Sequence, residues 1–275
     1  MLTDGKPDQW VIDFQRRTIH ESQRYRLPFE RVQATVLPHI ESLAAAEKKK
    51  SGKSSGQDQG WLQSWWRHFR SRQEMHDAIG KKKRYIACCE VTKRPTFAFV
   101  DTDIRPDKTL EVFAFDDDYS FGILQSSTHW HWFITKCSKL KSDFRYTPES
   151  VFDTFPWPQS PTAKHVKAVA AAAVHLRKVR ADALKQIPGG LRALYRTLEL
   201  PGRSPLKDAH ADLDSAVLDA YGFSPKKDLL AQLLALNHEV AAAEQAGDPV
   251  TPPGIPPTYP AKDRAALITK DCIEP

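Results

Sequence analysis

The sequence predicts an α+β protein in which a mixed or antiparallel sheet is followed by an all-helical region. Three segments, 84–91, 96–101 and 110–115, are rich in β-branched and aromatic residues and are divided by turn-forming residues, which predicts strands in an antiparallel meander. Beyond residue 160, apolar residues recur at the spacing of a helix face. Between the two halves lies 119–158, a stretch dense in aromatic and basic side chains around which the chain is organised.

The composition is that of an ordinary globular protein. Of 275 residues, 41% are hydrophobic and 27% are charged. No apolar run approaches the roughly 18 residues of a membrane helix, and the N-terminus lacks an apolar secretory segment, so we expect a cytoplasmic protein. The cysteines form no Cys-x-x-Cys pair, which favours reduced thiols over a zinc site.

The net charge of +6 is concentrated in one part of the chain, between residues 61 and 94. Its basic residues are Arg67, Arg70, Arg72, Lys81, Lys82, Lys83, Arg84, Lys93 and Arg94, against Glu74, Asp77 and Glu90. Such a concentration favours a polyanionic partner, because neutralising phosphates releases condensed counterions. The alternative is that these charges line a solvated loop.

The residues before this basic region predict a strand, a helix and a linker. A short strand is expected at 10–14, and a helix across 25–47 in spite of Pro38. The segment 48–60, rich in Lys, Ser and Gly, has little to bury and is expected to be disordered. A helical segment at 61–70 then interleaves aromatic and basic residues, which either anchor a core or stack on nucleic-acid bases.

The acidic triplet at 116–118 predicts the N-cap and first turn of a helix over 119–133, rather than a metal site. On that helix His129 and His131 are two residues apart and point to different sides, which disfavours zinc binding. A compact polar cluster able to hydrogen-bond base edges or phosphate lies on the same helix: Ser126, Ser127, Thr128 and His129.

Four amphipathic helices are expected in the second half, and they can bury their apolar stripes against each other. They run from Ser160-Pro161 to Ile187, over 191–198, over 212–221 up to Gly222, and from Ser224-Pro225 to Gly247. The expected organisation is therefore a sheet-containing domain at 1–160, a helical domain at 161–247 and a Pro-rich extended tail at 248–275.

Several sequence patterns occur in one order along the chain and together carry a resemblance. They are Trp10-Val-Ile-Asp-Phe14, Arg84-Tyr-Ile86, Phe121-Gly-Ile-Leu-x-Ser-x-x-His129-x-x-Trp132, Arg145-Tyr-Thr-Pro148, Phe152-x-x-Phe155-Pro-x-Pro158, Leu213-Asp-x-Ala-Val-x-x-Ala-Tyr-Gly222 and Leu233-x-x-Leu236-Asn237. Over about 9–247 the chain resembles the C-terminal part of MmeI-like type IIG or IIL restriction-modification proteins and related adenine-specific DNA methyltransferases.

The resemblance implies a target recognition domain at 1–160, which reads the DNA sequence, followed by a helical segment. In this family the region lies downstream of a catalytic domain that transfers a methyl group from S-adenosylmethionine to the N6 of adenine. This chain has neither the glycine-rich cofactor loop nor the Asn-Pro-Pro-Tyr motif of that domain, and no nuclease signature. It also has Ser127 where family members often have arginine.

We therefore expect a DNA-specificity module of a restriction-modification system active in phage defence. The catalytic half is expected to be encoded separately or lost, so whether the chain is part of a working enzyme stays open. Its expected partners are double-stranded DNA and a methyltransferase catalytic domain or subunit that carries S-adenosylmethionine. No catalytic residue, metal ligand or cofactor is assigned to this chain, and no membrane contact is expected.

Two sets of residues are assigned to DNA. The phosphate-binding candidates are Arg67, Arg70, Arg72, Lys81, Lys82, Lys83 and Arg145. The base-reading candidates are Lys93, Arg94, Ser126, Ser127 and His129. Two other interpretations remain open, namely a protein-interaction module whose aromatic residues dock another polypeptide, and a gene remnant without function.

Overall fold

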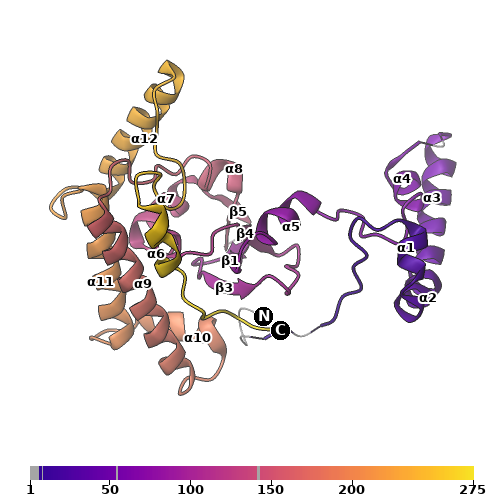
Figure 1. The fold of residues 1–275 in the computed structure, drawn as a ribbon, viewed down its shortest axis with the longest axis horizontal. Coiled ribbons are helices and arrows are strands. Elements are labelled where there is room, and N and C mark those ends of the chain that lie inside the picture. Colours follow the sequence, from indigo (N-terminus) through magenta and orange to yellow (C-terminus); the bar gives the residue numbers. More distant parts are fainter. Residues whose placement is uncertain (1–5, 8, 54, 141–142) are drawn as a thin grey trace. The chain divides into compact units, whose positions relative to one another are not determined.

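A computed structural model describes residues 6–7, 9–53, 55–140 and 143–275, with the backbone alone at residue 140. Their contacts divide the chain into two compact units (Figure 1). The helical unit is Asp8–Ala78; the sheet unit contains Ile79–Pro275 and also Lys6 and Pro7.

The helical unit is built from short helices around a small aromatic core. Its helices are α1 (Ile19–Gln23), α2 (Arg26–Thr35), α3 (Leu37–Ser51), α4 (Gln57–Leu62) and α5 (Gln73–Ile79), whose last residue already belongs to the sheet unit. Thr18 caps α1 by accepting from the backbone of Glu21, whose carboxylate in turn accepts from the backbone of Thr18. Phe14, Phe29 and Val32 form the core, and Trp65 and Trp66 pack against it.

Two predictions for the start of this unit are wrong. Residues 10–14 form no strand, because the chain turns at Gln15 (φ 52°) and Phe14 packs against the ring of Phe29, 6.1 Å away. The single helix expected at 25–47 is two helices that meet at Val36. Pro38, which has no N–H to donate, lies in the first turn of α3, where none is needed.

The segment expected to be a disordered linker, 48–60, is mostly helical. Helix α3 continues to Ser51 and ends at Gly52, whose φ of 66° is left-handed. The carboxylate of Glu47 then accepts hydrogen bonds from the backbone N–H groups of Gln57, Asp58 and Gln59, which fixes the first turn of α4. The helix predicted at 61–70 is also wrong for most of its length. Helix α4 ends at Leu62, and turns follow.

The sheet unit contains the three predicted strands, β1 (Arg84–Cys89), β3 (Ala98–Asp101) and β4 (Leu110–Phe113). They are antiparallel, but their order is β3-β1-β4, so β1 is central and the sheet is not a meander. A second small sheet has the order β2-β6-β5 and joins β2 (Val91–Thr92), β6 (Asp143–Arg145) and β5 (Ser138–Leu140). The predicted α+β class is confirmed.

The remaining helices lie near their predicted positions, but the single helix expected at 119–133 is divided into two at Ser126, and the caps expected at Ser160 and Ser224 are instead Thr162 and Asp228. The helices are α6 (Asp118–Gln125), α7 (Ser127–Lys136), α8 (Pro148–Val151), α9 (Ala163–Leu184), α10 (Gly190–Arg196), α11 (Pro205–Tyr221) and α12 (Leu229–Ala246), with 3₁₀ turns at Thr197–Glu199 and Ala261–Leu267. Asp117 is the N-cap of α6, as the acidic triplet predicts. Gly222 and Gly247 end α11 and α12 in the left-handed conformation, also as predicted. Helix α11 begins seven residues early because Ser204-Pro205 provides its cap.

The main hydrophobic core of the sheet unit extends from Ile86 to Leu267, and a second, smaller cluster contains Ile79, Tyr85, Ala87, Val100 and Ile104. Helix α6 packs on α9, and α9 lies beside α11 (Figure 1). Because Phe121 on α6 and Val169 on α9 are both buried in the main core, the structure has no core boundary at residue 160, where the composition changes.

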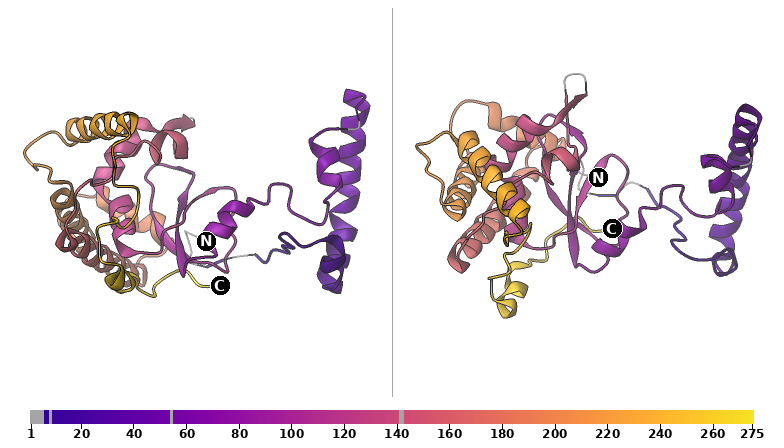
Figure 2. Two further views of the ribbon diagram at one scale, coloured as in Figure 1. Left: turned by 45° about the horizontal axis from the view of Figure 1, so that its top comes forward. Right: turned by 90° about the horizontal axis from the view of Figure 1, so that it is seen from above.

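The C-terminal tail is part of this fold rather than a free extended segment. Tyr259 and Leu267 are buried in the core. The tail then returns to the first sheet, where Ile273 exchanges backbone hydrogen bonds of 2.9 Å with Phe99 and Asp101 (Figure 2). These contacts make the tail a structural element of the sheet unit.

Candidate nucleic-acid interface

The lysines at 81–83 are the predicted phosphate contacts of the sheet unit with the fewest partners inside the protein. All three are exposed and lie between α5 and the start of β1. Lys82 has one long ion pair, 3.9 Å from Nζ to the carboxylate of Asp116. Because little holds these ammonium groups within the protein, they are available to an external anion.

Arg70 and Arg72 are exposed in the helical unit. The guanidinium of Arg70 lies 5.5 Å from the centre of the Phe69 ring. The backbone of Arg72 has a φ of 42°, so the chain turns sharply just before α5. Both side chains present their charge to solvent.

Two of the predicted phosphate contacts have partners inside the protein. The guanidinium of Arg67 donates to the carbonyl oxygens of Arg16 and Arg17 at 2.8–3.1 Å, so it holds the turn before α1. Arg145 forms an ion pair with Glu90, 2.6 Å from Nη2 to Oε1. Arg67 is therefore a structural residue, and the charge of Arg145 is largely balanced.

Two of the predicted base-reading residues are buried and cannot reach a base in this structure. Ser126 caps α7, accepting from the N–H of His129 and donating to the carbonyl of Ile123. His129 is enclosed, with Nε2 2.9 Å from the hydroxyl of Tyr146. Burial lowers the pKa of His129 to about 3, so the imidazole is neutral. The sequence identified the polar cluster but could not show that Ser126 and His129 are buried while Ser127 lies near the surface.

The other candidates lie near the surface. Lys93 is exposed in the loop after β2, and the next residue, Arg94, is half-buried with its guanidinium 5.5 Å from the centre of the Trp130 ring. Ser127 begins α7, and its N–H donates to the carboxylate of Asp214 on α11, 2.7 Å away. The charge of Arg94 also reaches Asp214, whose pKa burial raises and Arg94 partly lowers. The structure thus brings Arg94 and Ser127 to the same side of α7.

Three residues that lie next to Arg94 or Ser127 in the structure were given no role from the sequence. Trp130 supplies the ring under Arg94, Asp214 anchors the first turn of α7, and His131 is exposed with Nδ1 2.7 Å from the carbonyl of Ser127. The only available signal was position, since Trp130 and His131 follow the predicted polar cluster directly. The contribution of Asp214, 87 residues away, required the fold.

A buried network of charges fixes the framework behind this surface. Asp118 accepts hydrogen bonds from Arg84 at 2.7 Å and from Arg177 at 2.6 Å. Asp271 in the tail pairs with both arginines, and although burial alone would raise its pKa, Arg177 lowers it to about 2. The network joins β1, α6, α9 and the tail. Its arginines form ion pairs with its own carboxylates.

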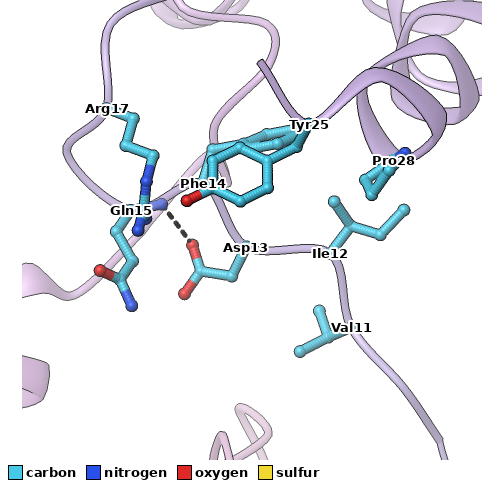
Figure 3. A pocket seen from close by; sticks show the side chains of 8 residues that line it. All are labelled: Val11, Ile12, Asp13, Phe14, Gln15, Arg17, Tyr25 and Pro28. Atoms are coloured by element: carbon cyan, nitrogen blue, oxygen red, sulfur yellow. Dashed lines mark hydrogen bonds between the residues drawn. The ribbon is translucent and has the colours of Figure 1, made fainter. Parts of the chain in front are cut away.

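The helical unit has a shallow pocket of about 330 Å³ (Figure 3). Apolar side chains make up most of its wall, and Arg17 lies 5.3 Å from the centre of the Tyr25 ring. Among the described residues no group of three or more His, Cys, Asp or Glu side chains is placed to hold a metal ion. No helix in the described part of the chain is both long and apolar enough to span a bilayer.

Comparison with known proteins gives three findings. The model of the family "MmeI, target recognition domain" matches residues 16–159, just over half of the chain. DNA methyltransferase A of Bacillus subtilis (strain 168) is 31% identical over 125 residues, which is 44% of this chain and 13% of that protein. A solved structure of the type IIL restriction-modification enzyme MmeI in complex with DNA matches 75% of this chain and 26% of its own, at 25% identity and a TM-score of 0.60.

The chain thus spans about an eighth of the curated relative and about a quarter of the solved one. The match to the family model agrees with the order of sequence patterns from Arg84 to Pro158 and with the α+β fold. On this evidence the chain belongs to the MmeI target recognition domain family.

Proposed function

We propose that this chain binds double-stranded DNA and selects the sequence on which a restriction-modification system acts. The observation that carries the proposal is the match of the target recognition family to residues 16–159. It is supported by the similarity to an enzyme solved in complex with DNA.

The charge distribution fits this role. The lysines at 81–83 and the arginines Arg70 and Arg72 are exposed, and among the described residues the 3.9 Å contact between Lys82 and Asp116 is the one ion pair that they make. Exposed ammonium and guanidinium groups hold phosphates and so set the register of a protein on the duplex. Lys93, Arg94 and Ser127 are then the residues that remain available to read bases.

The methyl transfer belongs to a partner catalytic domain or subunit. That partner would bind S-adenosylmethionine and methylate the N6 of an adenine that it extrudes from the duplex. We propose that the assembly is of type IIG, acts in the cytoplasm and protects the cell against phage DNA. Within it, this chain would hold the duplex and specify the site.

The salt dependence of binding tests the proposal. We expect the purified chain to bind a pool of random-sequence duplexes, with log affinity falling linearly with log salt between about 50 and 200 mM. The double substitution K81Q/K83Q should make that slope shallower by about 0.9 for each phosphate that the chain no longer neutralises, and should weaken all sequences alike. Fluorescence anisotropy of labelled duplexes measures both effects.

The matched control is K226Q/K227Q, which removes two exposed lysines between α11 and α12. This variant changes the net charge by the same amount as K81Q/K83Q. If it weakens DNA binding equally, binding depends only on the total charge and not on the lysines at 81–83. If the unaltered chain binds no duplex at low salt, the proposed function is wrong.

A further inference from the structure

The backbone around Arg94 is fixed by its own loop. The Thr92 hydroxyl donates to the carbonyl of Arg94 at 2.9 Å and accepts from the N–H of Arg94 at 3.3 Å. Pro95, which is buried, follows directly and restricts the conformation further. The side chain of Arg94 therefore leaves a rigid turn.

The guanidinium of Arg94 lies against aromatic rings, and further aromatic residues pack against one of these rings, that of Trp130. The guanidinium lies 5.5 Å from the centre of the Trp130 ring and 6.0 Å from that of Tyr195. Trp130 stacks on Phe133, with ring centres 5.5 Å apart, and meets Phe144 edge-on at 6.2 Å. Packing of this kind limits the rotamers of the arginine before any ligand arrives.

The charge of Arg94 is not balanced by an ion pair among the described residues. The nearby carboxylate of Asp214 is occupied by the N–H of Ser127. A second guanidinium, that of Arg180, lies near that of Arg94, since burial and then the charges of Arg180 and Arg94 lower the pKa of His210. A half-buried arginine in such a setting is suited to an external acceptor.

One more donor or acceptor faces outward on the same helix as Trp130. His131 is exposed, and its Nδ1 is engaged by the carbonyl of Ser127 at 2.7 Å. Its Nε2 is therefore the ring nitrogen left for a ligand. Arg94 and His131 approach Asp214 from different elements, since both affect the pKa of that carboxyl.

We propose that Arg94, held on Trp130, reads a guanine of the recognised sequence, with His131 contacting the neighbouring base or phosphate. Guanine presents two acceptors, O6 and N7, in the major groove, and the two donors of a guanidinium match them. A rigid platform makes this contact specific, because fewer orientations of the arginine must be frozen on binding. The inference rests on the proposed function and assigns a base to one residue.

The test begins with the full chain and a pool of duplexes with a randomised segment. We expect selection followed by sequencing to yield a preferred site that contains at least one guanine. Replacing that guanine by 7-deazaguanine removes N7 and leaves base pairing intact, so it should weaken binding of the unaltered chain about 5- to 150-fold. The affinity of R94A for the natural site should be lower by a similar factor. Its affinity should not change when the guanine is replaced by 7-deazaguanine.

A second variant guards against a folding defect in R94A. R94Q keeps a polar side chain, and since glutamine pairs with adenine, it should move the preference at that position from guanine towards adenine. K226A is the control: Lys226 is an exposed lysine between α11 and α12, and its removal should leave the base preferences unchanged.

The inference is overturned if R94A and R94Q bind DNA with the base preferences of the unaltered chain, or if no preferred position is a guanine sensitive to 7-deaza substitution. Absence of any duplex binding by the unaltered chain would instead remove the proposed function, and this assignment with it. The two failures are therefore distinguishable in one set of titrations.

Discussion

His129 is enclosed by aromatic rings on several sides, which determines its protonation. The ring centres of Phe97 and Phe155 lie 5.5 and 5.0 Å away, and the hydroxyl of Tyr146 is 2.9 Å from Nε2. Because this surrounding is too apolar to stabilise an imidazolium, burial lowers the pKa to about 3. A side chain of this kind contributes to packing in the core behind α7.

This burial predicts a loss of stability in mild acid. In the unfolded chain His129 titrates near 6.5, so between about pH 6.5 and pH 3 the unfolded state binds a proton that the folded state does not. The free energy of unfolding should therefore fall with decreasing pH, by about 1.4 kcal/mol per pH unit from this residue. In H129Q the slope between about pH 6 and pH 5 should be shallower by that amount, as measured by urea denaturation.

Two comparisons isolate the effect. Asp117, whose pKa burial raises to about 6, contributes a slope of opposite sign, but it does so in both proteins. Y146F removes only the hydroxyl partner of His129, so it should lower the free energy of unfolding by about 1 kcal/mol at every pH and keep the slope. If the curves of H129Q and the unaltered chain are parallel, the imidazole is not buried as described.

At the scale of elements, the sequence predicted which segments are helices far better than how they pack. Caps and stops such as Asp117, Gly222 and Gly247 act within a few residues, and each was found where the sequence placed it. The strand expected at 10–14 failed because a strand needs a partner, which no local pattern reveals. The linker expected at 48–60 was too long because the carboxylate of Glu47, which caps α4, lies ten residues before Gln57, and no local pattern shows such a contact.

Gly122 marks the closest approach between α6 and α9. A Cβ atom at this position would lie 3.3 Å from Cβ of Ala173 and 2.6 Å from Cγ1 of Val169, and the second distance is closer than such atoms approach. We expect G122A to be less stable by about 1–3 kcal/mol, because the strain of overpacking exceeds the roughly 1 kcal/mol gained in helix propensity. Chemical denaturation followed by circular dichroism measures the change.

The control is another helical glycine with free space around it. Among the described residues, and apart from the two neighbours of Gly60 and the backbone of α4 itself, no atom lies within 4 Å of a Cβ built on Gly60, so G60A should gain stability by about 0.5–1 kcal/mol. A stabilising G122A would mean that α6 and α9 do not pack as closely as described.

For the molecule as a whole, the domain boundary that the composition suggests differs from the extent of the hydrophobic core. The composition of the sequence changes near residue 160, yet α9 packs against both α6 and α11, so the main core extends across this point, from Ile86 to Leu267. The basic lysines at 81–83 could be foreseen, since charge alone predicts exposure. The internal role of Arg67 could not, because its partners are the backbone carbonyls of Arg16 and Arg17, whose positions relative to Arg67 depend on the fold.

The division into two units predicts which fragments fold. A fragment of residues 73–275 keeps the complete α5, both sheets, the core and the tail, so we expect it to unfold cooperatively, with a near-ultraviolet circular dichroism signal from Trp130, Trp132 and Trp157. Its thermal midpoint should lie within about 4 °C of the corresponding transition of the full chain, which is the shift that about 1 kcal/mol causes in a domain of this size.

A fragment of residues 161–275, cut where the composition changes, provides the contrast. Val166, Val169 and Ala173 on α9 would lose α6 as their covering, and Arg177 and Asp271 would lose Asp118 and Arg84. Exposing these apolar stripes removes most of the hydrophobic stabilisation of the helices, so we expect no cooperative transition and no near-ultraviolet signal. If this fragment instead unfolds cooperatively while 73–275 does not, the core is divided at residue 160 after all.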